Sequence, residues 1–302
     1  MGQQGAGEAG SATIQGASVT VGGVRSPVLA AGPTSASEAV VYVHGNPGSS
    51  RDWPALASEV GAFARFVALD MPGFGHADKP GSFDHSVEGY ARHLAGALDA
   101  LEIQRAHLVL HDFGGPWGLA WAAAHPDAFA SVTLLGTGIL FDYRWHRLAR
   151  LWRTPILGEL SMLAARARPF WRALATELPS GFRDQMFADF DAGTRRAILR
   201  LYRASGDVPA FARRQAAALA PLRRPALVVW GRRDPYLPWS LAERQREVFP
   251  GAHVAILDGS GHWPFVDEPQ GVRDLVVPFL RLQIGRDRTA AALPAFPRQR
   301  GV

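Results

Sequence analysis

Short apolar segments recur along this chain, and their spacing constrains its fold more than any other feature. From Ala39 onward most of them are apolar on both faces and are separated by helical patterns. Such alternation predicts an α/β fold: a mostly parallel eight-stranded sheet with helices on both faces. The first two segments lie close together and are expected to form an edge hairpin. The expected strands are 17–21, 26–30, 39–43, 65–69, 106–111, 131–135, 226–230 and 253–257.

One connection in this pattern is far longer than the others. Roughly 90 residues separate Leu135 from Ala226, whereas a parallel crossover needs only about a dozen. The surplus has helical patterning and predicts an inserted cap over the carboxyl ends of the strands, where open α/β sheets bind ligands. The predicted division is a flexible segment at 1–16, a core at 17–137 and 222–284, a helical cap at 138–221 and a flexible tail at 285–302.

The composition excludes several classes of protein. The chain has no cysteine, so disulfides, thiolate catalysis and Cys-zinc sites are ruled out. Its net charge of +5 comes from arginine, with Lys79 as the single lysine, and no nucleic-acid motif accompanies it. No apolar run approaches the roughly 20 residues of a membrane span, and the first residues do not resemble a secretory signal. We expect a cytoplasmic protein without nucleic-acid binding or stable membrane insertion; the oligomeric state stays open.

The stretch "LVLHDFGGPWGLAWA" (108–122) places an aspartate between a predicted strand and a predicted helix. Pro116 lies where a first-turn proline is tolerated, and Gly114 and Gly115 give the backbone room. Asp112 therefore lies on a sharp strand-to-helix turn, the layout of the nucleophile elbow G-x-S-x-G with Asp in place of Ser. The alternative reading of Asp112 is a helix N-cap, a position that favours Asp.

Three more polar stretches follow predicted strands. They are "VHGNPGSS" (43–50), "WGRRDPYLP" (230–238) and "GSGHWPFVDEP" (259–269). Asp112, Asp234 and His262 thus occur in the chain order nucleophile, acid, histidine. The alternatives are a turn residue for Asp234 and a surface-loop histidine for His262.

Over residues 18–282 the sequence resembles the α/β-hydrolase superfamily, in particular its Asp-nucleophile branch of haloalkane dehalogenases and epoxide hydrolases. The resemblance rests on "HGNP", "HDFGG", "GRRDP", "SGHWPFVDEP" and "LDMPGFGHADKP", in order. It implies that the backbone N–H groups of Asn46 and Phe113 bind the developing oxyanion. It also implies that the Asn46 side chain holds a leaving halide.

The residue type at the elbow indicates the reaction. An ionised Asp needs no activating base and can displace a leaving group at an sp³ carbon, leaving an alkyl-enzyme ester. His262 would activate the water that hydrolyses this ester, and Asp234 would orient the imidazole. We expect a haloalkane dehalogenase-like hydrolase that takes a small apolar substrate and water and needs neither cofactor nor metal.

The pattern departs from both subfamilies. Dehalogenases carry Trp after the nucleophile, whereas Phe113 has no side-chain N–H. Epoxide hydrolases use two cap tyrosines, for which Tyr143 and Tyr202 are the candidates. A β-lactone decarboxylase-like enzyme and a non-catalytic ligand binder are further alternatives, and Asp142 is a rival to Asp234 as the acid. Tryptophans that could supply the missing donor are Trp117, Trp145, Trp152 and Trp171.

Overall fold

The computed structural model describes residues 12–166 and 178–285, and its centre is an eight-stranded sheet. The strand order is β1-β2-β4-β3-β5-β6-β7-β8, with β2 antiparallel to both neighbours and all other pairs parallel. The fold class, the edge hairpin and all eight expected strands are confirmed. The strands are β1 (Gln15–Val21), β2 (Val24–Ala31), β3 (Glu38–Val43), β4 (Arg65–Leu69), β5 (Arg105–His111), β6 (Phe129–Leu135), β7 (Ala226–Gly231) and β8 (His253–Leu257).

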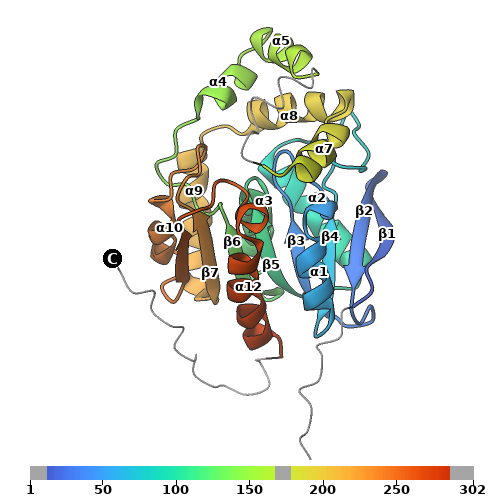
Figure 1. Ribbon diagram of the computed structural model, residues 1–302, viewed down its shortest axis with the longest axis vertical. Helices are drawn as coiled ribbons and strands as arrows, with labels where there is room; N and C mark the ends of the chain where they lie inside the picture. Colours follow the sequence, from blue (N-terminus) through green and yellow to red (C-terminus); the bar gives the residue numbers. More distant parts are fainter. Residues whose placement is uncertain (1–11, 167–177, 286–302) are drawn as a thin grey trace, which may run out of the picture.

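The two faces of the sheet carry separate apolar cores. Along β3, Val41 and Val43 pack on one face while Val40 and Tyr42 pack on the other, which is the period of a strand. Burial on both faces explains why these segments are continuously apolar. The first core is covered by α2 (Val87–Ala100), α3 (Gly114–Ala124) and α9 (Val208–Leu219), and the second by α1 (Pro54–Gly61) and α12 (Pro269–Gln283), which lie in front of the sheet in Figure 1.

Helices from the long insertion lie above the carboxyl ends of the strands (Figure 1). They are α4 (Arg147–Arg153), α5 (Leu157–Ala164), α7 (Ser180–Asp189) and α8 (Ala192–Ala204). An ion pair between Arg51 and Asp189 joins this layer to the core. The last helix of the insertion, α9, instead packs beside the sheet, where Gln215 Nε2 donates to the carbonyl of Pro116 in α3 (2.9 Å).

Short helices complete the connections between these elements. They are η1 (Ser50–Asp52), η2 (Ala220–Leu222), α10 (Leu241–Arg244), η3 (Gln245–Glu247) and α11 (Pro264–Asp267). Near the amino end, β1 begins at Gln15 and the N–H of Ala12 donates to the carbonyl of Ser58 (3.2 Å). The strand thus extends two residues into the segment expected to be flexible, because it pairs with β2 along its whole length. Residues 1–11 and the predicted tail from 286 lie outside the described residues.

Candidate active site

Asp112 lies immediately after β5 in a left-handed backbone conformation, with φ of +47°. L-residues avoid this region, although Asp tolerates it better than most. Two hydrogen bonds to its carbonyl hold the turn: one from the N–H of Gly115 (2.9 Å) and one from Thr137 Oγ1 (2.6 Å). Asp112 is therefore presented on a strained, externally supported turn at the start of α3.

Two glycines allow the elbow to approach the end of β3. A Cβ atom on Gly45 would lie 2.3 Å from Asp112 Cβ, and one on Gly114 would lie 2.3 Å from the carbonyl oxygen of Val43. Real Cβ atoms do not approach so closely, so any side chain at either position would push the elbow away from β3. This close fit brings the backbone of the β3 loop against the Asp112 carboxylate.

Asp112, His262 and Asp234 meet at the carboxyl edge of the sheet. His262 Nδ1 donates to Asp234 Oδ2 (2.8 Å), and Nε2 lies 3.3 Å from Asp112 Oδ2. Asp234 Oδ1 accepts the backbone N–H groups of Tyr236 (2.8 Å) and Leu237 (2.9 Å). The acid is thus itself oriented by the loop after β7, and the histidine lies between two carboxylates.

The electrostatics of this group favour an ion pair in the resting site. Burial opposes the charge on His262, but the charge of Asp234 and the hydrogen bond to Asp112 outweigh it and raise the pKa of His262 to about 10. Burial likewise opposes the charge on Asp112, but hydrogen bonding to His262 and its charge lower the pKa of that carboxyl. At neutral pH these shifts favour an imidazolium at His262 paired with the carboxylate of Asp112.

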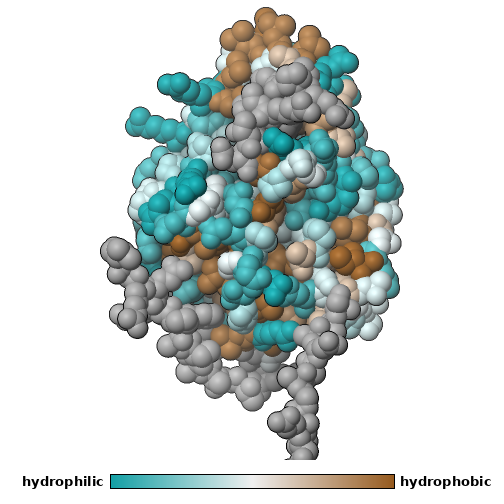
Figure 2. Space-filling model, in the orientation of Figure 1, coloured by the Kyte–Doolittle hydropathy of each residue, from teal (hydrophilic) through white to brown (hydrophobic). Residues whose placement is uncertain are grey.

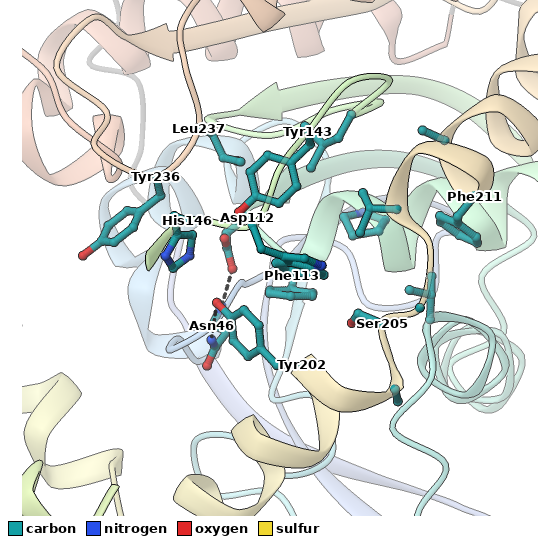
Figure 3. A pocket seen from close by; sticks show the side chains of 18 of the residues that line it. Asn46, Asp112, Phe113, Tyr143, His146, Tyr202, Ser205, Phe211, Tyr236 and Leu237 are labelled. Atoms are coloured by element: carbon teal, nitrogen blue, oxygen red, sulfur yellow. Dashed lines mark hydrogen bonds between the residues drawn. The ribbon is translucent and has the colours of Figure 1, made fainter. Parts of the chain in front are cut away.

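The second oxygen of Asp112 faces the loop after β3. Asp112 Oδ1 accepts the backbone N–H of Asn46 (2.7 Å), the contact drawn as a dashed line in Figure 3. The Asn46 side chain donates through Nδ2 to the hydroxyl of Tyr202 (3.3 Å). The ring of Phe113 packs edge-on against Tyr202, with centroids 5.1 Å apart. The core wall thus offers a backbone donor, while one N–H of the Asn46 side chain is engaged by Tyr202.

A cavity of about 290 Å³ opens between Asp112 and the cap. Asp112, Asn46 and His262 line its floor, and aromatic side chains of the cap line its roof, among them Tyr143 and Tyr202 (Figure 3). Burial raises the pKa of both tyrosines, so their hydroxyls stay protonated. The site combines an apolar enclosure with a few converging polar groups, which is the usual character of a small-molecule site.

The remaining candidates from the sequence fall in different places. Asp142 is largely exposed and pairs with Arg244, so it does not approach His262. Trp117 is fully buried and stacks on Tyr90 (4.1 Å between centroids), away from the cavity. Trp145 and Trp152 line the cavity roof. Trp171 lies outside the described residues.

Three residues at the site were not predicted from the sequence. Thr137 supports the elbow through its hydroxyl, and Tyr236 packs on His262 with centroids 5.0 Å apart. His146 lines the cavity from the start of α4. The position of Tyr236 two residues after Asp234 could have indicated its role, but His146 lies in an arginine-rich segment where no local pattern marks it as a residue of the cavity.

Metal-binding clusters are absent from residues 12–166 and 178–285: no three His, Cys, Asp or Glu residues there are grouped so that they could hold a metal ion. No helix there is both long and apolar enough to cross a membrane.

Residues 38–269 match the family model of the alpha/beta hydrolase fold, and the chain belongs to this family. Among curated relatives, a 2-hydroxy-6-oxo-2,4-heptadienoate hydrolase of Pseudomonas putida is 28% identical over 276 residues, covering 87% of this chain and 95% of the relative. A 2-hydroxymuconate semialdehyde hydrolase of a Pseudomonas species is 27% identical over 256 residues, covering 80% and 86%.

Solved structures share the same architecture. The haloalkane dehalogenase DatA of Agrobacterium tumefaciens C58 superposes with a TM-score of 0.77 at 22% identity, covering 89% of this chain and 97% of that one. A 2-hydroxy-6-oxo-6-phenylhexa-2,4-dienoate hydrolase of Rhodococcus has a TM-score of 0.74 at 20% identity, covering 90% and 100%. At these identities the likeness shows the fold alone.

Proposed function

We propose that this protein hydrolyses a bond at an sp³ carbon through an ester formed on Asp112. The observation that carries the proposal is the carboxylate at the elbow, where the fold's usual motif has a Ser. A Ser would need a base to become a nucleophile, whereas the lowered pKa of Asp112 keeps it ionised. The small cavity, which several aromatic side chains help to line, suits a small apolar substrate and one water.

In the first step Asp112 Oδ2 attacks the carbon, a C–O bond forms, and the bond to the leaving group breaks with its electron pair on that group. Oδ1 becomes the carbonyl oxygen of the ester and keeps the N–H of Asn46. The ester is neutral, so His262 loses the charge and hydrogen bond of Asp112 that help raise its pKa. Its pKa falls, and its proton leaves to solvent.

In the second step the neutral His262 takes a proton from water, whose oxygen attacks the ester carbonyl carbon. Charge develops on Oδ1 and is stabilised by the N–H of Asn46. Asp234, held by two backbone N–H groups, stabilises the imidazolium that forms. Cleavage of the ester releases the alcohol and returns Asp112 and the protonated His262.

Haloalkane hydrolysis is our first candidate for this chemistry, and epoxide hydrolysis is the second. The second is favoured by Tyr143 and Tyr202, whose hydroxyls lie on the cap wall of the cavity and stay protonated. In that reaction one hydroxyl would give its proton to the epoxide oxygen and recover it from solvent. The curated relatives are named as hydrolases of 2-hydroxy-6-oxo-2,4-heptadienoate and of 2-hydroxymuconate semialdehyde, substrates for which the elbow Asp offers no evident advantage.

A trapping experiment tests the proposal. The His262→Gln variant should still be alkylated but should not hydrolyse the ester. It is incubated with bromoalkanes, terminal epoxides, β-lactones and a 2-hydroxy-6-oxo-dienoate, and intact and peptide masses are measured. We expect an adduct on the peptide containing Asp112, and its mass identifies the compound class.

The matched control is the double variant Asp112→Asn, His262→Gln, with its intact mass checked for deamidation. An adduct that persists in the double variant, or that lies on another residue, contradicts the mechanism. Absence of any adduct, together with no turnover by the wild type, would favour a non-catalytic binder instead.

A further inference from the structure

His146 projects into the cavity from the cap and has no role in the steps above. It is the N-cap of α4 and lines the same cavity as Asp112, as Figure 3 shows. The ring of Tyr236 packs against it, with centroids 5.1 Å apart, and also against His262. His146 is therefore a positioned side chain on the cap side of the site, opposite the carboxylate at the elbow.

The capping contact determines which nitrogen of His146 carries the proton. Nδ1 accepts the backbone N–H of Ala149 (3.1 Å), so the proton of a neutral ring lies on Nε2. Burial lowers the pKa of His146, opposed by the charge of Asp112, which favours the neutral ring. Among the described residues, no hydrogen bond involves Nε2. The side chain thus presents a neutral N–H donor that has no described protein partner.

The core wall offers few such donors at the side-chain level beside Asp112. Phe113 has no side-chain N–H, and one of the two N–H groups of Asn46 Nδ2 is engaged by Tyr202. A departing anion in a largely apolar cavity needs donors, because burying a charge without hydrogen-bond partners is strongly unfavourable. The core wall therefore offers few side-chain donors to this cavity, whereas His146 offers an N–H from the cap side.

We propose that His146 Nε2–H binds the leaving group as it becomes anionic, so that the cap, rather than the residue after the nucleophile, supplies this donor. This inference rests on the proposed function. For a haloalkane, the C–halogen bond breaks with its electron pair on the halide, and His146 keeps its proton and donates a hydrogen bond. For an epoxide, the same N–H would donate to the ring oxygen, which takes its proton from a cap tyrosine.

Two substitutions separate the capping role of His146 from its donor role. In His146→Asn the side-chain oxygen takes the place of Nδ1 and caps α4, but no group reaches the position of Nε2. In His146→Gln the amide N–H reaches the position of Nε2, but the cap acceptor is lost. Each is combined with His262→Gln, and the rate of alkylation of Asp112 is followed by intact mass, with thermal melts to verify folding.

We expect alkylation by chloroalkanes to slow by about 100-fold in the Asn variant, the effect of removing one preorganised donor. The Gln variant should recover most of this rate although its helix is uncapped. The loss should be larger for chloride than for iodide, since the poorer leaving group needs more stabilisation. A parallel series with terminal epoxides shows whether halide or epoxide oxygen is the partner.

Several outcomes would overturn the inference. An unchanged rate in the Asn variant, with the adduct forming normally, removes the donor role and leaves the proposed function intact. Slowing in the Gln variant alone, or equal slowing for all leaving groups, means that His146 acts only through the structure of α4. No adduct in the His262→Gln background itself contradicts the proposed function, and the inference with it.

Discussion

The core and the cap each contain a non-glycine residue with a left-handed backbone, and the two are held very differently. Asp112, with φ of +47°, is fixed by hydrogen bonds from Gly115 and Thr137 and by close contact with Gly45. Ile156, with φ of +69°, precedes α5 and is 72% exposed. Figure 2 shows apolar side chains gathered around α5, the region that we call the tip of the cap.

The surroundings fix the backbone conformation at Asp112, whereas the backbone at the exposed Ile156 is held by less of its surroundings. Strained conformations persist only when the surroundings over-determine them, and at functional sites the strain positions a group for reaction. The strained backbone at Asp112 is over-determined by its neighbours in this way, whereas that at Ile156 is not. We therefore expect substitutions on the core wall to cost far more activity than those on the cap.

The largest effect is expected from Asp234→Asn. The amide would donate to His262 Nδ1 and leave the proton on Nε2, so the ring could no longer accept a proton from water. Hydrolysis of the ester should fall by about 10⁴-fold, while alkylation of Asp112 continues and the adduct accumulates. Single-turnover kinetics with mass detection measure both steps. Asp142→Asn, which changes an exposed carboxylate, is the control and should leave both rates unchanged.

Gly45→Ala should be the next most damaging change. Its methyl group would lie 2.3 Å from Asp112 Cβ, so the elbow must shift. We expect a loss of about 100-fold in turnover, the cost of misplacing a reacting group by about 1 Å, and a stability loss of about 1–3 kcal/mol from overpacking. The control is Gly181→Ala in α7, where a Cβ atom meets nothing within 4 Å. Equal losses of turnover and stability in the two variants would contradict the expected difference between core and cap.

Tyr202→Phe tests the cap wall. It removes the acceptor of the Asn46 amide while keeping the ring that packs on Phe113. Haloalkane turnover should fall by about 10-fold at most, since the hydroxyl does not take part in that reaction. Epoxide turnover should fall by about 100-fold or more if the hydroxyl acts as an acid. Comparing the two substrate classes in one variant, with Tyr143→Phe beside it, shows which reaction the cap serves.

The two histidines should give opposite pH dependences of stability. The pKa of His262 is raised to about 10, so its contribution is complete below its unfolded value near 6.5 and is lost as the pH rises toward 10. The pKa of His146 is lowered, so its neutral form costs stability only as the pH falls below 6.5. Urea unfolding of wild type, His262→Gln and His146→Asn from pH 5 to 10 measures both. A difference between wild type and His262→Gln that does not shrink above pH 6.5 would contradict the ion pair.

The smallest effect is expected from Ile156→Gly, which should be slightly stabilising. Glycine adopts positive φ without strain, and Ile156 buries little apolar surface to lose. We expect a gain of up to about 1 kcal/mol and unchanged turnover, measured by thermal melting and kinetics. A marked destabilisation would show that the exposed tip makes contacts that hold the cap.

The sequence by itself determined the sheet and the placement of Asp112, Asp234 and His262. Continuous apolar runs mark strands buried on both faces, and a residue directly after a parallel strand must lie at the shared carboxyl edge. Because these positions depend on local pattern and on one topological rule, three residues separated by up to 150 positions (112 to 262) could be expected to meet. Their roles in catalysis remain a proposal.

Only the tertiary structure decided which cap residues face Asp112, Asp234 and His262. Nothing local distinguishes His146 in the cavity from Asp142 in solvent, four residues earlier, or Trp145 in the roof from Trp117 in the core. The cap takes its position from packing against distant segments, as Tyr202 of α8 does against Phe113 and Asn46. Such contacts form across long sequence separations and leave no periodic trace, so the chemistry of the cap wall could be seen only in the folded chain.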